Sequence, residues 1–341
     1  MKKDRNNRLS KLHIIIETVC LVLVFVATLF ACNKFLDDNA GKDTGQHLDI
    51  PINSVLVKEE ERFVDSLKHV FNDTVVAINA PLVVNYISCG QGDCTLLTCE
   101  GQSLLIDAGP NEAGTLIQNY LNKLGITKLD YVVLTHYDYD HAGGMDVIIQ
   151  KFDCRTVFLP DYTIDTKSYL NCWISMDAKG YRAVSPEPGT EFMLGSAKVS
   201  ILAPSDYNSD DENNYSVCLR VQYGRTSFLF TGDAESEEEN ELMVSGFDID
   251  ADVLHVGHHG SYTSTSQEFL DEVTPTYAVI SCGMDNPHGH PHRSTLNKLK
   301  EKNIKVFRTD EQGNIIATSN GTTISWNRSP SYTWNTGTVQ E

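Results

Sequence analysis

Four side chains of the kinds that bind metal ions stand within six consecutive residues of the sequence. They are two imidazoles and two carboxylates: His136, Asp138, Asp140 and His141. A hydrophobic run at residues 131–134 predicts a strand before them, and the small residues 142–144 after them let the backbone approach closely. Ligands at this spacing, at the end of a strand, can converge on one metal ion or on two neighbouring ions. A helix cap made by Asp140 would explain one carboxylate and neither histidine.

The composition favours local rather than general recognition of a charged substrate. The 341 residues include 27 Lys+Arg and 46 Asp+Glu, giving a formal net charge of −19, and 41% are hydrophobic. The hydrophobic content excludes a disordered chain. The acidic balance excludes a protein that holds duplex nucleic acid through a basic surface. A phosphate substrate would therefore have to be held locally, by metal ions.

Alternating strands and helices must position the ligands. Short β-rich runs at residues 82–87, 95–98 and 103–106 precede a helical pattern at residues 115–124, and the alternation continues to about residue 326. We therefore predict an α/β domain at residues 78–330 with a tail at residues 331–341. Polar residues follow three later strands of this domain: Asp233 after residues 228–230, His258 to Ser261 after residues 251–256, and Asn286 to His292 after residues 278–282.

Together these segments resemble the metallo-β-lactamase-fold hydrolases. The common metal motif of that fold is HxHxDH, and the variant here, with Asp138 in place of a histidine, resembles one branch, the C-terminal domain of ComEC-type DNA-uptake proteins. Five further segments are similar to that branch: Gly90 to Asp93 (GQGD), Leu105 to Gly109, Phe228 to Ala234, His258 to Ser261 (HHGS) and Gly289 to Pro291 (GHP). The resemblance implies a four-layer αββα sandwich of two mixed sheets, covering about residues 81–326.

The resemblance also implies roles for the ligands. His136 and Asp138 would hold a first ion, Asp140, His141 and His258 a second, and Asp233 would bridge the two. We favour His258 over His259 as the ligand, with His259 as the open alternative. The implied catalytic residues are Asp140, which would orient the attacking water, together with His290 and His259, which would stabilise phosphoryl oxygens or protonate the leaving group.

Other polar residues are expected around the ligands. Asp107 resembles the buried carboxylate that orients a ligand in this fold, with a turn or helix cap as the alternative. The remaining residues expected to support ligands or contact substrate are Gln91, Asp93, Asn214 and Ser261. For Asn214, and for Ser216 beside it, a surface loop is an equal alternative. His255 lies within a predicted strand, which is typical of a core or surface histidine.

The ligand set predicts the metal. No histidine lies between residues 142 and 254, where the fold usually has its third histidine ligand. With Asp138 also replacing a histidine, the first site is rich in oxygen, which favours Mn²⁺, or Mg²⁺, over Zn²⁺. We therefore expect two divalent metal ions per chain and activation by manganese.

These features predict a phosphodiesterase or nuclease. The expected substrate is single-stranded DNA or another nucleic acid, attacked by water that two metal ions activate. Hydrolysis of another small ester or thioester is one alternative, because this fold hosts many reactions. A non-catalytic binding module at the cell surface is another. The resemblance covers only the hydrolase domain of the ComEC-type proteins, so DNA import by this chain is not implied, and no protein partner can be deduced.

The N-terminal segment predicts attachment to a membrane. Residues 14–32 form an apolar run interrupted by Glu17 as its only charge, which as a helix would span about 28 Å. Five Lys or Arg lie before the run, and acidic residues follow it, which places the domain outside the membrane. Leu29 to Cys32 also resemble a lipoprotein cleavage site, and a cleaved secretory signal is a third reading.

Three remaining segments carry weaker expectations. Residues 33–77 are predicted as a linker with an amphipathic helix at residues 54–71, for which packing on the domain and self-association are both open. The nine cysteines contain no CxxC pair and are predicted as small buried hydrophobic residues, with a disulfide as the alternative. The acidic runs at residues 210–212 and 235–239 are predicted as solvated surface.

Overall fold

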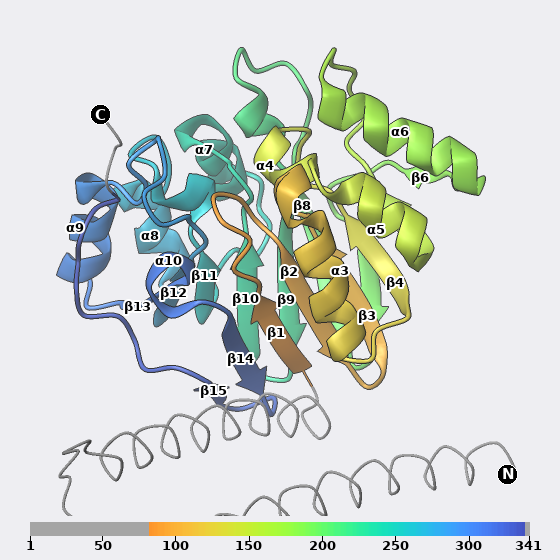
Figure 1. The fold of residues 1–341 in the computed structure, drawn as a ribbon. Coiled ribbons are helices and arrows are strands. Elements are labelled where there is room, and N and C mark those ends of the chain that lie inside the picture. Colours follow the sequence, from red (N-terminus) through yellow and green to blue (C-terminus); the bar gives the residue numbers. More distant parts are fainter. Residues whose placement is uncertain (1–81, 338–341) are drawn as a thin grey trace, which may run out of the picture. The chain divides into compact units, whose positions relative to one another are not determined.

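The structure, a computed structural model, describes residues 82–337, which contain two β-sheets. The first has eight strands (Figure 1). In spatial order they are β15 (Ile324–Trp326), β14 (Ile315–Ser319), β1 (Leu82–Tyr86), β2 (Thr95–Cys99), β3 (Gln102–Ile106), β4 (Lys128–Val133), β5 (Asp153–Phe158) and β6 (Ala183–Val184). The predicted strands at residues 82–87, 95–98 and 103–106 agree with β1, β2 and β3 to within one residue at each end.

The second sheet has seven strands. In spatial order they are β13 (Lys305–Arg308), β12 (Tyr277–Ile280), β11 (Val253–His255), β10 (Thr226–Phe230), β9 (Cys218–Tyr223), β8 (Ala197–Ala203) and β7 (Glu191–Leu194). β10 to β13 pair in parallel, whereas β7 to β10 pair antiparallel. This sheet is therefore mixed, as the first sheet is, in which β3 to β6 pair in parallel.

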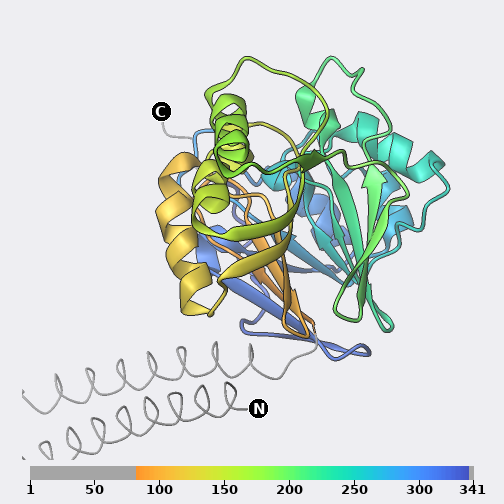
Figure 2. The same cartoon turned by 90° about the vertical axis from the view of Figure 1, so that its right-hand side faces the viewer.

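Helices cover the outer face of each sheet, which makes four layers (Figure 2). Those on the first sheet are α3 (Gly114–Lys123), α5 (Met145–Lys151) and α6 (Lys167–Lys179). Those on the second are α7 (Ser236–Val244), α8 (Gln267–Val273) and α9 (Arg293–Glu301). The α/β sandwich expected from the sequence is confirmed for the described residues.

Three apolar layers hold the sandwich together. Strand residues such as Val84 and Phe228 fill the space between the two sheets. Ile117 and Leu121, four positions apart on α3, bury one face of that helix against the first sheet, as a period of 3.6 residues requires. Phe269 on α8 belongs to the corresponding layer on the second sheet. Burial of these side chains is the main force that fixes the strand ends relative to each other.

The ends of the parallel strands bring the polar segments to one region. β4 ends just before His136, β10 just before Asp233, and β11 just before His258. Short elements carry several of these residues: α4 (Tyr139–Ala142), which lies at the upper edge in Figure 1, and the 3₁₀ turn η3 (Gly257–Gly260). The remaining short elements are the 3₁₀ turns η1 (Asn111–Ala113) and η2 (Glu212–Tyr215) and the helix α10 (Thr309–Gln312).

Several sequence-based expectations concern residues outside 82–337. The membrane anchor at residues 14–32 and the amphipathic helix at residues 54–71 both lie outside the described residues. Within residues 82–337, the structure has no helix that is both long and apolar enough to cross a bilayer. The seven cysteines of this part are all buried and unpaired, as small hydrophobic residues would be.

One expectation about acidic residues is wrong. Glu238 and Glu239, predicted as solvated surface, are each only 1% exposed. Glu239 accepts hydrogen bonds from the backbone amides of Thr265 and Ser266, so its burial is compensated. The pattern of charges along the chain could not reveal this because the partners lie 26 and 27 residues away.

Candidate metal centre

A compact group of buried carboxylates and imidazoles lies where the strand ends meet. One ligand atom from each of Asp93, His141, Asp233 and His259 lies within 4.8 Å of the others, and all four residues are buried. His141 Nε2 is 3.1 Å from Asp233 Oδ1 and 3.3 Å from His259 Nε2. Asp140 Oδ2 is 3.2 Å from His259 Nε2. The two sheets thus contribute to one ligand cluster.

Asp107 sets the direction of the His141 ring. Its Oδ2 atom lies 2.8 Å from His141 Nδ1, and both its oxygens accept hydrogen bonds from Thr135, one from the backbone amide and one from the hydroxyl, each at 2.8 Å. A carboxylate that receives Nδ1–H fixes the tautomer and leaves the Nε2 lone pair directed at the cluster. Thr135 was not singled out from the sequence, although it directly precedes the ligand motif.

The two histidines of the HHGS segment occupy different environments. His259 is 1% exposed, and its Nδ1 lies 3.0 Å from the carbonyl oxygen of Ser281, which can only accept. His259 Nδ1 must therefore carry a proton, which leaves Nε2, the nitrogen beside Asp233 and Asp140, as the atom that could bind a metal ion. His258 Nε2 is 3.7 Å from Asp233 Oδ2, while its Nδ1 is 3.1 Å from Glu235 Oε1. The sequence favoured His258 as the metal ligand of this pair. The geometry instead favours His259.

His136 and Asp138 lie beside this group. The two rings of His136 and His141 have centroids 4.2 Å apart, and His136 Nε2 lies 3.8 Å from Asp138 Oδ2. His136 Nε2 is buried and has no hydrogen-bond partner among the residues that the structure describes, whereas its Nδ1 lies 3.1 Å from the hydroxyl of Thr135. Asp138 has a side chain that is 45% exposed, so it faces the open side of the site.

The buried carboxylates of the cluster make positive charge favourable at its centre, as the shifts in pKa show. Burial works against the charged imidazole, yet Asp233 and Asp107 raise the pKa of His141 well above its usual value. Against the same burial effect, Asp233 and Asp140 raise the pKa of His259 to about 10. His141 and His259 in turn hold the pKa of Asp233 well below its usual range, again against burial. A divalent cation would supply the same positive charge.

The donor set fits such a cation. Three buried atoms of the candidate ligands, His136 Nε2, Asp93 Oδ1 and Asp233 Oδ1, have no hydrogen-bond partner among residues 82–337. Unpartnered polar atoms of this kind are costly in a folded protein unless an ion or water satisfies them. Imidazole nitrogens and carboxylate oxygens together suit first-row divalent metals such as Mn²⁺ and Zn²⁺.

Three other predicted site residues, Gln91, Asn214 and Ser261, form hydrogen bonds outside the ligand cluster. Gln91 Oε1 accepts from the amide of Gly283 at 3.1 Å and positions a loop. Asn214 accepts from the amides of Glu235 and Glu238 and so caps the start of α7. Ser261 Oγ pairs with the hydroxyl of Thr263 at 2.8 Å within the HHGS turn. These hydrogen bonds stabilise the segments around the site, and none of them joins a residue of the ligand cluster.

His290 lies close to the HHGS histidines. Its ring centroid is 5.3 Å from that of His258 and 6.0 Å from that of His259, and its buried Nδ1 has no hydrogen-bond partner within the described part of the chain. Asn286 holds it in place through hydrogen bonds to the backbone amide and carbonyl of His290. Burial and then the neighbouring imidazoles lower the pKa of His290 to about 3, so the ring is neutral.

Two glycine-containing loops lock the ligand helix α4. The amide of Asp93 donates to the carbonyl of Asp140 at 3.0 Å, and the amide of Ala108 donates to the carbonyl of His141 at 2.9 Å. Gly92 has a φ of +141°, and a Cβ atom there would lie 2.2 Å from the Asp140 carbonyl oxygen. Only glycine therefore allows this contact.

We expect Gly92→Ala to disturb the metal centre itself. The added Cβ must displace either the loop or the Asp140 backbone, so the affinity for Mn²⁺ should fall by about tenfold or more. Gly90→Ala is the matched control because Gly90 also has a positive φ, +88°, but its Cβ would meet nothing within 4 Å. Titration of both variants with Mn²⁺ measures the difference. Equal losses of affinity would show that backbone strain, rather than the contact with Asp140, is responsible.

Comparison with known proteins identifies the family. A family model described as the metallo-beta-lactamase superfamily matches residues 87–284. The chain belongs to the metallo-beta-lactamase superfamily.

Within this family, the chain is related to competence proteins. It is 31% identical over 250 residues to ComE operon protein 3 of Bacillus subtilis, covering 68% of this chain and 32% of that protein. It is 33% identical over 229 residues to competence protein ComA of Neisseria gonorrhoeae, covering 66% of this chain and 30% of that protein. A weaker similarity, 22% over 181 residues, links it to endoribonuclease YSH1 of Yarrowia lipolytica, covering 46% of this chain and 21% of that protein. The chain thus spans about a third or less of the length of these relatives.

Proposed function

We propose that this protein is a metal-dependent phosphodiesterase that cleaves nucleic acid, with single-stranded DNA as the first candidate substrate. The observation that carries the proposal is the position of Asp233. Its Oδ1 atom faces His141 Nε2 at 3.1 Å, while its Oδ2 atom faces His259 and His258 at 3.5 and 3.7 Å. The charge of Asp233 also acts on His136, which belongs to the other proposed ligand group. We therefore take this buried carboxylate as the residue that two cations would share, an arrangement that suits in-line displacement at phosphorus.

The chain's own residues divide into two ligand groups and a substrate group. His136 and Asp138 would hold one ion, and Asp140, His141, His259 and the buried Asp93 the other, with Asp233 shared. Divalent ions bound there would neutralise phosphate oxygens and lower the pKa of water towards ~7. Asp140 would orient the attacking water, and His290 would donate a hydrogen bond to a phosphoryl oxygen from the neutral ring.

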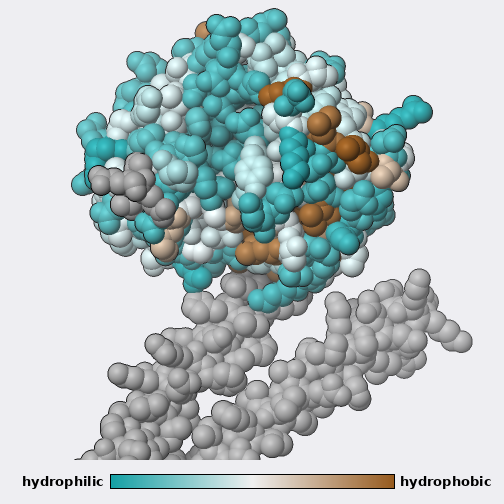
Figure 3. Space-filling view, turned by 45° about the horizontal axis from the view of Figure 1, so that its top comes forward, coloured by the Kyte–Doolittle hydropathy of each residue, from teal (hydrophilic) through white to brown (hydrophobic). Residues whose placement is uncertain are grey.

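The surface and the relatives support this assignment. Figure 3 shows that hydrophilic residues cover most of the visible face, as expected where a charged, hydrated substrate binds. Leu170, Trp173 and Ile174 of α6 are among the exposed large hydrophobic side chains. One relative is named an endoribonuclease, an enzyme that cleaves RNA, which supports nucleic acid as the substrate class. We further propose that residues 14–32 attach the chain to a membrane with the hydrolase domain outside.

The function can be tested on the full-length chain. Bound metal is first counted, and cleavage of a bis-aryl phosphodiester and of labelled single-stranded DNA is then measured with Mn²⁺, Mg²⁺ and Zn²⁺ at matched free concentrations. We expect two metal ions per chain and cleavage of both substrates. Two bound ions without any cleavage would contradict the proposal and direct the search to small esters or to a binding role.

The same assay tests the identity of the metal. Because two carboxylates, Asp138 and Asp140, stand in the ligand motif and no histidine lies between residues 142 and 254, Mn²⁺ should give the highest rate. Equal or higher activity with Zn²⁺ would show that the oxygen-rich first site does not determine the metal preference.

A further inference from the structure

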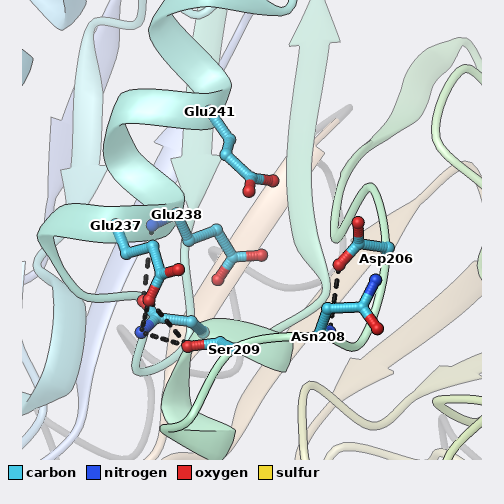
Figure 4. A pocket seen from close by; sticks show the side chains of 7 residues that line it. Asp206, Asn208, Ser209, Glu237, Glu238 and Glu241 are labelled. Atoms are coloured by element: carbon cyan, nitrogen blue, oxygen red, sulfur yellow. Dashed lines mark hydrogen bonds between the residues drawn. The ribbon is translucent and has the colours of Figure 1, made fainter.

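A polar cavity lies beside α7, on a different set of residues from the metal centre. Its volume is about 140 Å³, and Figure 4 shows that the side chains of α7 line one wall and those of the loop before η2 the other. Its lining side chains are acids, amides and one hydroxyl: Asp206, Asn208, Ser209, Asn214, Glu237, Glu238 and Glu241. None of these is a basic residue, so the carboxylates have no counter-charge within the cavity lining.

Glu238 is the unusual member of this group. The residue is 1% exposed, and neither of its carboxylate oxygens has a hydrogen-bond partner within the described residues. In Figure 4 its carboxylate points across the cavity towards Asp206. A buried carboxylate without donors is strongly unfavourable unless it is protonated or binds a cation. Burial, and then the charge of Glu241, raise the pKa of Glu238 well above its usual value, which expresses the same cost.

The other carboxylates are placed around it. Glu241 accepts from the hydroxyl of Ser205 at 2.7 Å, and Asp206 accepts from the amide of Asn208 at 3.0 Å. Glu237 is held to the side because its Oε2 accepts from Ser209 and Asn214. Figure 4 shows the carboxylates of Glu238, Glu241 and Asp206 facing the same space, with the Asn208 amide at its edge. This arrangement offers oxygen atoms from two chain segments and no nitrogen ligand other than amides.

We propose that this cavity is a second cation site that binds Ca²⁺ through Glu238, Glu241, Asp206 and the side-chain oxygen of Asn208. Calcium takes six to eight oxygen ligands in flexible geometry, which suits carboxylates on a helix and a loop better than the strict octahedron of Mg²⁺ does. The absence of imidazole and thiolate in the lining disfavours Zn²⁺.

The site is connected to the metal centre through Asn214. Asn214 Oδ1 accepts from the amide of Glu238, and two residues further along the chain Ser216 Oγ accepts from the amide of Asp233 at 3.0 Å. A cation that ties the loop to α7 would therefore also hold the segment that supports Asp233. The role of the cation is structural support, since no cavity residue contacts the ligand cluster in the structure.

Equilibrium dialysis with radioactive Ca²⁺ tests the proposal. The full-length chain is first loaded with two equivalents of Mn²⁺, so that the metal centre is occupied. We expect one additional Ca²⁺ per chain and a rise in melting temperature on the order of 5 °C at Ca²⁺ concentrations about 100 times the dissociation constant. Glu238→Gln should weaken Ca²⁺ binding by about tenfold or more while retaining both Mn²⁺ ions, because a neutral glutamine keeps the shape of the side chain.

Two further variants complete the design. Glu241→Gln should also weaken Ca²⁺ binding. Because Glu241 is exposed, this variant should fold normally and can replace Glu238→Gln if that variant folds poorly. Glu272→Gln on α8 removes one exposed negative charge outside the cavity and should leave Ca²⁺ binding unchanged. Absence of the additional Ca²⁺, or its retention in both cavity variants, would overturn the proposal, whatever the result of the nuclease assay.

Discussion

Replacing Asp140 with asparagine is expected to lower the rate of phosphodiester cleavage by on the order of 100-fold or more. The carboxylate faces His259 Nε2 at 3.2 Å, so its loss removes a ligand and the group proposed to orient the attacking water. The fold should survive because the Asp140 side chain is 25% exposed and its backbone contacts do not depend on the carboxylate. Single-turnover cleavage rates, together with thermal unfolding, separate these two effects.

Asp153→Asn provides the control for Asp140→Asn. Asp153 begins β5 and is exposed, so the substitution removes the same charge away from the cluster and should leave the rate unchanged. If Asp140→Asn retained the rate of Asp153→Asn, the hydrolase proposal would fail and a binding role would gain support.

The second large effect should separate the two adjacent histidines. His259→Ala is expected to remove one of the two bound metal ions and to abolish cleavage, because His259 Nε2 lies within the buried ligand cluster. His258→Ala is expected to retain both ions, because the His258 Nδ1 atom pairs with Glu235 and its Nε2 lies further from Asp233. Counting bound metal by mass spectrometry or atomic absorption gives the answer directly.

The opposite pattern would restore the preference that the sequence suggested. Loss of one ion in His258→Ala with both ions retained in His259→Ala would assign the ligand to His258 and would leave His259 as a substrate contact. Each variant is therefore the control for the other, since both remove one imidazole from the same turn.

The sequence predicted the fold well because the pattern of apolar residues directly reflects burial. Runs such as residues 82–87 and 103–106 became fully or largely buried strands, and the pattern at residues 115–124 became α3. The HxDxDH motif could also be singled out from the sequence as a candidate metal site, because its four side chains are close in sequence. A local pattern of residues is enough to predict a strand or a helix, because these elements are formed by neighbouring residues.

The finer geometry of the site could not be predicted because it depends on backbone conformation and distant partners. His258 and His259 both have positive φ, 48° and 53°, which turns their rings in directions that no residue pattern indicates. Similarly, Asn214 was expected either to contact substrate or to lie in a surface loop, whereas its role as a cap of α7 depends on amides more than 20 residues away. Glu238 stands in an acidic run that was predicted to be solvated, but in the structure it is buried and faces the loop that contains Asp206 and Asn208.

The ligand cluster also has a consequence for the order of events during folding. His141 and His259 approach to 3.3 Å although 118 positions separate them in the chain, and they belong to opposite halves of the sandwich. Neither half alone contains all the candidate ligands, so a nascent chain would not assemble a complete metal site until both sheets have met. Metal binding would then follow the association of the two halves during folding. The bound ions would stabilise the folded state against separation of the two halves.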